Sequence, residues 1–184
     1  GMFILSVLRL STVDTVHALC QNNFLLWRCS MTMLTDLYQE TILQHNKSPK
    51  NFRTMELSSD YPTYTKEGYN PLCGDHFYVH VMLNDRKIHD IAFQGSGCAI
   101  SKASGSIMTA AVKGKYVEEA EQLFHEFHDM VMSDVSVPID ETKLGKLIVF
   151  GGVREFPMRV KCATLCWHAM KSAINGEDDT VTTE

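Results

Sequence analysis

The sequence lacks an excess of positive charge, a membrane-length apolar run and a disulfide-rich composition. Its 17 Lys and Arg against 22 Asp and Glu give a formal charge of −5, which argues against nucleic acid as the main partner. The apolar run at residues 3–10 is too short to span a membrane, and no basic stretch precedes it. Six cysteines in 184 residues are too few for a disulfide scaffold. We therefore expect a cytoplasmic protein in a reducing compartment, with neither a nucleic-acid nor a membrane partner.

The sequence also lacks local motifs that indicate a nucleotide-binding or zinc-finger site. Residues 95–101 could form an anion cradle before a helix, but neither the phosphate-loop pattern nor the dinucleotide fingerprint is complete. Cys73, Cys98 and Cys162 follow one another at intervals of 25 and 64 residues, which fit no zinc-ribbon or zinc-finger spacing. If these cysteines meet, the fold must bring them together.

The length suits one domain, which we expect over residues 31–175. Residues 1–30 differ from the rest: Gly1 before Met2 resembles the scar of an expression tag, and Met31 and Met33 precede a helical pattern. We favour a non-native or disordered leader added by an upstream start codon, and the alternative is an amphipathic arm that packs on a partner. Residues 176–184 are acidic and rich in Thr, which predicts a disordered tail.

Hydrophobic periodicity predicts a mixture of helices and one hairpin. The segment before Pro49 has a helical pattern from Leu34, and residues 47–69 read as a loop. Alternating apolar residues indicate strands at 77–83 and 88–94, joined by a turn at 84–87. Helices are predicted over residues 99–114, 117–132 and 144–150 (the last broken by Gly151-Gly152), and again from Pro157 onward.

Two cysteines flank the predicted hairpin. Cys73 lies just before its first strand and Cys98 just after its second, so an antiparallel pairing places both at the same end of the sheet. Cys162 falls in the first turns of the last helix, where the helix dipole should lower the pKa of a thiol. Thiolates together with the Asp75 carboxylate suit a tetrahedral zinc, and a thiolate is also the sulfur nucleophile.

Simpler interpretations exist for each of these residues. A single cysteine could be a small buried hydrophobe, although glycine turns at one end of a hairpin argue against this for the set. Cys166 shares a helix face with Cys162, and a packed thiol is favoured over an auxiliary sulfur acceptor. His125 and His128 are spaced for a metal pair but lack a third ligand in the sequence nearby. A Cys–His hydrolase is disfavoured because no histidine stands out as its base.

Three motifs together resemble the U-type iron–sulfur cluster assembly proteins, the family of IscU and the NifU N-terminal domain. They are Asn70-Pro71-Leu72-Cys73-Gly74-Asp75, Gly97-Cys98-Ala99-Ile100-Ser101 and Arg159-Val160-Lys161-Cys162-Ala163-Thr164-Leu165. The likeness runs from about Leu34 to Asn175. IscU-type scaffolds carry a histidine immediately before the third cysteine, whereas this chain has Lys161, which is similar to the SufU branch.

The resemblance implies an α+β fold, with a small antiparallel sheet and helices packed on one face. It implies a zinc-dependent sulfurtransferase that accepts persulfide sulfur on Cys73 from a SufS-type cysteine desulfurase and serves a downstream iron–sulfur scaffold. Zinc would be held by Cys73, Asp75, Cys98 and Cys162, and Arg159 and Lys161 are candidates for contacts with the desulfurase. Two alternatives stay open: a scaffold that carries a transient iron–sulfur cluster on the same ligands, and a domain in which zinc only stabilises the fold.

Overall fold

The computed structural model describes residues 36–183 apart from residue 57 and residues 177–179. The expected leader at residues 1–30 lies outside the described residues. Residues 38–184 make one compact unit, which holds every labelled helix and strand. None of the helices in the described part of the chain is long and apolar enough to cross a lipid bilayer.

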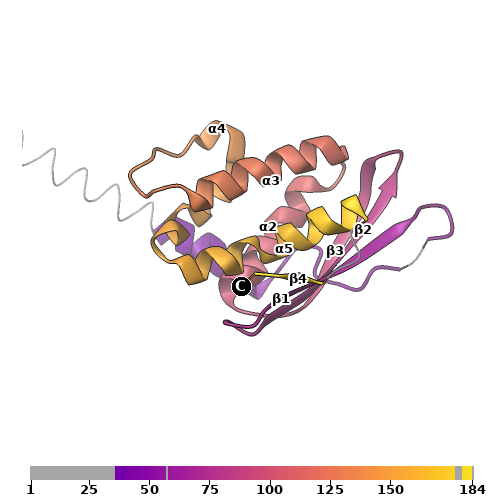
Figure 1. Cartoon of the computed structure of the whole chain (residues 1–184), viewed down its shortest axis with the longest axis horizontal. Coiled ribbons are helices and arrows are strands. Elements are labelled where there is room, and N and C mark those ends of the chain that lie inside the picture. The colour runs from indigo at the N-terminus through magenta and orange to yellow at the C-terminus, as the bar shows by residue number, and fades with distance from the viewer. Residues whose placement is uncertain (1–35, 57, 177–179, 184) are drawn as a thin grey trace, which may run out of the picture. The chain divides into compact units, whose positions relative to one another are not determined.

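A four-stranded sheet forms one layer of this unit (Figure 1). Its strands are β1 (Thr63–Asn70), β2 (Asp75–Asn84), β3 (Lys87–Ser96) and β4 (Val181–Thr182), in the spatial order β3-β2-β1-β4. The first three pair antiparallel, and β4 pairs parallel with β1. Asp85 and Arg86 turn the chain between β2 and β3 with φ of 46° and 62°, as a two-residue hairpin loop requires. The predicted hairpin is confirmed.

Strand β1 corrects the prediction of a loop over residues 47–69. Its sequence shows no apolar alternation because most of its residues are partly or fully exposed, and only Gly68 and Asn70 are buried. At Gly68 a Cβ would lie 3.2 Å from the Leu165 side chain, so the absence of a side chain allows the last helix to approach the strand. A polar strand near the edge of a sheet carries little of the periodic signal on which strand prediction depends.

The helical part of the unit lies on one side of the sheet (Figure 1). It comprises α2 (Ala99–Val112), α3 (Val117–Met132), α4 (Glu141–Leu144), the 3₁₀ helix η1 (Gly145–Glu155) and α5 (Pro157–Asn175). The predicted bounds of α3 are confirmed, but the helix expected at 144–150 is instead α4 followed by η1, which runs through Gly151 and Gly152. Gly151 packs closely, because a Cβ there would lie 2.4 Å from the Ile139 side chain.

The segment before β1 covers the free edge of β3. Residues 38–47 are helical and end before Pro49, as predicted. Downstream, Phe93 of β3 donates its N–H to Asn51 O at 3.0 Å and accepts the Arg53 N–H at 3.0 Å. The helix is tied to α2 by a 2.7 Å contact between His45 Nδ1 and Ser106 Oγ. These contacts leave the β3 edge paired rather than open to another chain.

Helix α5 is the centre of the core and determines where Cys162 lies. It packs on β1 and β2 and against α2 and α3. Trp167 is fully buried, stacks on Phe127 with ring centroids 4.7 Å apart, and donates its indole N–H to Ser104 Oγ at 3.1 Å. With this layer of helices on one face of a small sheet, the expected α+β fold class is confirmed.

The expected disordered tail contains a short strand in its described part. Val181 and Thr182 of β4 pair with Gly68 and Tyr69 of β1. Thr180 Oγ1 also donates to Glu67 Oε2 at 3.4 Å. An open β1 edge offers backbone partners to an extended segment whatever its side chains, which explains why composition alone did not predict this strand.

Candidate metal centre

Cys73 lies in the tight turn between β1 and β2. The turn begins after Asn70 and ends at Asp75, which face each other in the ladder. Gly74 adopts a φ of 69°, a left-handed conformation that suits glycine, and its N–H donates to Asn70 O at 2.9 Å. The Cys73 thiol is exposed, whereas Asp75, the first residue of β2, is fully buried.

Cys98 occupies the junction between β3 and α2, where it is the N-cap of the helix. Its Sγ accepts hydrogen bonds from the backbone N–H and the hydroxyl of Ser101, both at 3.5 Å. Its own N–H donates to Asp75 Oδ1 at 2.7 Å. The junction requires Gly97, because a Cβ there would lie 2.8 Å from Asp75 Oδ1 and 2.5 Å from the Phe77 ring.

Cys162 reaches the same place from the second turn of α5. It is buried, and its Sγ lies 3.1 Å from Cys73 Sγ. Asn70 Nδ2 donates to the same sulfur at 3.6 Å. A residue 89 positions beyond Cys73 in the chain is thus in direct contact with it.

Three of the four side chains singled out in the sequence form one cluster at this end of the sheet, and Cys98 adjoins it through Asp75. Ligand atoms of Cys73, Asp75 and Cys162 all lie within 4.8 Å of one another. Cys98 Sγ lies 3.8 Å from Asp75 Oδ2. The geometric inference that Cys73 and Cys98 share one end of the hairpin agrees with this arrangement. Three thiols and a carboxylate form a donor set that suits a tetrahedral soft or borderline metal.

The pKa values of the Cys98 and Cys162 thiols shift in opposite directions. Hydrogen bonds from Cys162 and Ser101 lower the pKa of Cys98 to about 6, although burial opposes this. The pKa of Cys162 is raised by its contact with Cys98, by burial and by its contact with Cys73. The argument that the helix dipole lowers the pKa of Cys162 does not apply, because Cys162 lies in the second turn of α5. The dipole acts within the first turn of a helix, which Cys162 lies beyond, and the N-cap position belongs to Cys98.

Asp75 is a buried carboxylate without a cationic partner. Among the described residues, no lysine, arginine or histidine forms an ion pair with it. One oxygen accepts the Cys98 N–H, and the other faces thiol sulfur. An uncompensated buried charge is costly, so this site fits a bound cation better than an empty cavity.

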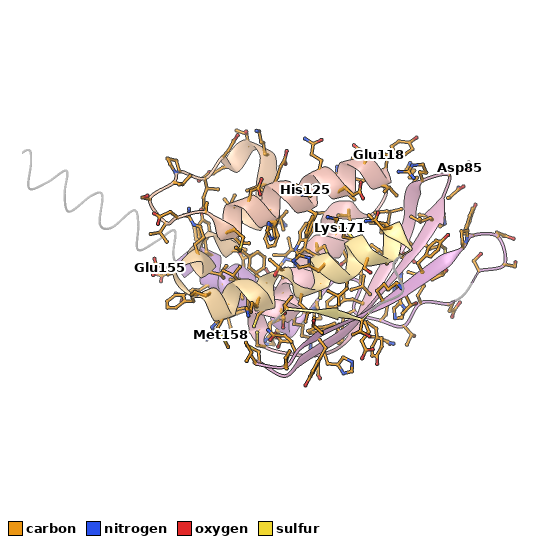
Figure 2. All side chains as sticks on the ribbon, in the orientation of Figure 1. Asp85, Glu118, His125, Glu155, Met158 and Lys171 are labelled. Atoms are coloured by element: carbon orange, nitrogen blue, oxygen red, sulfur yellow. The ribbon has the colours of Figure 1, made fainter. Side chains whose placement is uncertain are left out.

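Basic and apolar side chains are exposed at the N-terminal end of α5, the helix that carries Cys162. Arg159 is exposed and Lys161 is partly exposed, directly before Cys162. Phe156 and Met158 are 56% and 45% exposed, and Leu72 beside Cys73 is 57% exposed; Figure 2 shows Met158 at this end of α5. Exposed apolar side chains of this size are typical of a protein-docking surface.

Two other candidates do not join the site. Cys166 is buried against α2, where a Cβ at Gly105 would lie 3.0 Å from its sulfur, and burial raises the pKa of its thiol. Cys166 is therefore a thiol packed in the core, as the sequence indicates, and not an accessible sulfur acceptor. His128 gains a neighbour in His168, with ring centroids 5.8 Å apart. In the described part of the chain, however, the only cluster of three metal-ligating residues is the one at Cys73.

Sequence reasoning missed the roles of Asn70 and Ser101. Both stand inside the cysteine motifs, but neither was assigned a function. Asn70 is fully buried beside Cys162, and Ser101 is fully buried beside Cys98. The available signal was positional: an Asn at the start of a tight turn and a Ser three residues after a helix cap are both placed to bond the local backbone.

Comparisons with known proteins identify the family of the chain. The NifU-like N terminal domain model matches residues 37–163. The iron–sulfur cluster assembly scaffold protein IscU of Streptococcus pyogenes serotype M1 is 38% identical over 145 residues, which cover 79% of this chain and 87% of that protein. The zinc-dependent sulfurtransferase SufU of Bacillus subtilis (strain 168) is 36% identical over 145 residues, covering 79% of this chain and 94% of that protein.

A solved structure shows the same fold. It is a protein assigned as an iron–sulfur cluster assembly scaffold for the SUF system of Fervidobacterium islandicum AW-1, with a TM-score of 0.65 and 33% identity. The match covers 73% of this chain and 94% of that one. With a family model over more than half of its length and relatives above 30% identity, the chain belongs to the NifU-like N-terminal domain family, the group of iron–sulfur cluster assembly proteins that includes IscU and SufU.

Proposed function

We propose that this protein is a zinc-dependent sulfurtransferase of iron–sulfur cluster assembly, with Cys73 as the sulfur acceptor. The observation that carries the proposal is the contrast within the site: Cys73, Asp75 and Cys162 form a cluster with Cys98 beside Asp75, and Cys73 is the exposed cysteine of the three. The relative named as a zinc-dependent sulfurtransferase supports this assignment.

The residues present fit a zinc ion. Cys73, Cys98, Cys162 and Asp75 supply three thiolates and one carboxylate, the number of ligands of a tetrahedral set, and no described basic residue forms an ion pair with the buried Asp75. When bound, zinc would keep the thiols deprotonated at neutral pH without adding redox chemistry. The carboxylate is the weaker type of ligand, which suits a site that must release one thiolate.

The transfer step needs only an exchange of sulfur. The Cys73 thiolate attacks the terminal sulfur of a persulfide on the partner, forming a new S–S bond. The S–S bond of the donor breaks, and its electron pair leaves on the donor cysteine as a thiolate. No net oxidation occurs, because a persulfide and a thiolate are converted into a thiolate and a persulfide.

The partner that supplies a protein-bound persulfide is a cysteine desulfurase of the SufS type. The exposed Cys73 lies beside Leu72, and Arg159 with Lys161 adds positive charge near the site. Leu72 can bury apolar area against a partner, while the charges of Arg159 and Lys161 attract an anionic persulfide. A downstream iron–sulfur scaffold would then receive the sulfur from Cys73.

A second function, a scaffold for a transient iron–sulfur cluster, is favoured by one observation: the relative named IscU is 38% identical. Lys161 argues against it, since a lysine before the third cysteine provides no ligand where IscU-type scaffolds carry histidine. Protein purified without air distinguishes the two functions. A colourless protein with one zinc per chain supports the sulfurtransferase, whereas a brown protein with iron and acid-labile sulfide supports the scaffold.

The direct test of sulfur transfer uses a SufS-type desulfurase and ³⁵S-cysteine. We expect zinc-loaded protein to stimulate cysteine turnover and to carry the label after the desulfurase is removed. Label without cluster formation supports the proposal. Protein that binds zinc but neither stimulates turnover nor takes up label would be a domain in which zinc only stabilises the fold.

A further inference from the structure

We infer that Asn70 is a positioning residue that directs sulfur to Cys73 and away from Cys162. The inference rests on the proposed function and concerns which thiolate of that site reacts. Asn70 is fully buried at the end of β1 and lies between the turn that carries Cys73 and the sulfur of Cys162.

Both ends of the Asn70 amide have defined partners. Its Oδ1 accepts the Leu72 N–H at 3.2 Å, and its Nδ2 donates to Cys162 Sγ at 3.6 Å. The orientation of the amide follows from the first contact, because a backbone N–H can only donate and must face the oxygen. The nitrogen is then left to face the sulfur. One side chain thus holds the Cys73 turn and the Cys162 sulfur in fixed relation.

The three thiols differ in the N–H and O–H donors that reach them. Cys98 Sγ accepts the Ser101 N–H, the Ser101 hydroxyl is shared between this sulfur and Cys98 O, and Cys162 Sγ accepts one hydrogen bond from Asn70. Within the described residues, the only hydrogen bond to Cys73 Sγ comes from the Cys162 thiol. Among the described residues, Cys73 is therefore the one thiol of the three whose sulfur no N–H or O–H group reaches.

A hydrogen bond to a thiolate withdraws electron density and weakens it as a nucleophile. It also anchors a metal ligand, as outer-shell partners do at other metal sites. Asn70 and Ser101 therefore keep Cys162 and Cys98 as ligands, whereas Cys73 stays both exposed and nucleophilic. Exposure alone would not protect Cys162, because its sulfur lies only 3.1 Å from that of Cys73, so a sulfur atom bound to one thiol lies close to the other.

The test is the site of alkylation in zinc-loaded protein treated with limiting iodoacetamide, read by peptide mass spectrometry, with zinc retention followed by native mass spectrometry. In the wild type, Cys73 should react first. Asn70→Asp retains an oxygen for Leu72 N–H and removes the donor. We expect it to raise modification of Cys162 relative to Cys73 roughly tenfold, the scale of losing one hydrogen bond to a charged group.

Ser101→Ala is the matched control, because it removes one donor from Cys98 and none from Cys162. It should raise modification of Cys98 instead. An unchanged ratio of Cys162 to Cys73 modification in Asn70→Asp with zinc bound would overturn the inference. If Asn70→Asp loses zinc, Asn70→Ser is compared in the same way. Loss of zinc from both variants would show that Asn70 is needed only for the structure of the site, which also overturns the inference.

This readout separates the inference from the proposed function, because no desulfurase is present. If Asn70→Asp shifts alkylation from Cys73 to Cys162 but the protein takes up no sulfur from a desulfurase, the proposed sulfurtransferase function is wrong and the role of Asn70 still holds. If wild type and Asn70→Asp both take up sulfur on Cys73 and have identical alkylation patterns, the proposed function holds and the inference about Asn70 is wrong.

Discussion

The backbone N–H of Cys98 donates to Asp75 Oδ1 at 2.7 Å, which joins the first residue of β2 to the N-cap of α2. This bond brings one thiol to the only buried carboxylate in the described part of the site. It also uses one carboxylate oxygen, so the second remains for a metal. Whether the negative charge of Asp75 is neutralised therefore depends on a metal ion bound at the site.

Asp75→Asn tests that charge balance. The amide oxygen can still accept the Cys98 N–H, but the variant removes a buried charge that forms no ion pair with the described residues. We expect metal-free protein to unfold at the same or a higher temperature, and zinc affinity to fall by about a hundredfold. Calorimetry with and without EDTA should show a smaller zinc-dependent rise in Tm than in wild type. An unchanged rise would remove Asp75 from the ligand set.

Gly97→Ala tests the packing of the β3–α2 junction. The new Cβ would lie 2.5 Å from the Phe77 ring and 2.7 Å from Ser101 Oγ, so the junction must shift. Overpacking of this kind costs about 1–3 kcal/mol of the free energy of unfolding. Zinc content should fall together with stability in urea denaturation.

The matched control for this variant is Gly152→Ala, where no atom lies within 4 Å of the new Cβ. Its zinc content should equal that of wild type. Equal losses in both variants would mean that crowding at the junction does not control the site.

His168 should make stability depend on pH independently of the thiols. Burial, with His128 and Lys171 nearby, lowers its pKa from 6.5 to about 4. A lowered histidine pKa means that the unfolded chain binds the proton first, so this contribution is complete above pH 6.5 and is lost as pH falls toward 4.

The measurement is Tm between pH 7 and pH 4 for the wild type and His168→Gln. The variant should lose less stability over this interval, because it has no proton to gain on unfolding. His125→Gln, at an exposed position of α3, serves as the control and should follow the wild type. Parallel curves for His168→Gln and wild type would contradict the burial argument.

We predict that residues 1–30 are dispensable. Their composition fits neither a signal nor the core, and the helical pattern of the domain begins after Met33. A chain that starts at Met31 should keep its zinc content and its Tm. Aggregation, or a Tm lower by several degrees, would assign the segment to the fold or to an interface.

The sequence predicted one side of the site but not the other, for physical reasons. An antiparallel hairpin fixes which of its ends coincide, so the placement of Cys73 and Cys98 followed from local pattern alone. Cys162 comes 64 residues after Cys98 on a helix whose position depends on packing around Trp167, so only family resemblance connected it to the site. Asn70 stayed unnoticed because its role depends on that same long-range contact.

Strands β1 and β4 show the same limit on prediction. Neither carries apolar alternation, and both exist because a neighbouring edge supplies backbone partners. The helix α3, by contrast, has a continuous apolar stripe and acidic residues in its first turn, and its predicted bounds were right. Elements with their own amphipathic signal are predictable, whereas elements that depend on a partner strand are not.

The central claim is that Cys73 carries the transferred sulfur, and the most direct measurement is its location. Zinc-loaded protein is incubated with a SufS-type desulfurase and cysteine, and peptides are mapped by mass spectrometry for one added sulfur. We predict the added sulfur on Cys73, no stimulation of the desulfurase by Cys73→Ala, and most of the activity in Cys166→Ala, whose thiol is buried. Sulfur on Cys166, or a fully active Cys73→Ala, would contradict the account.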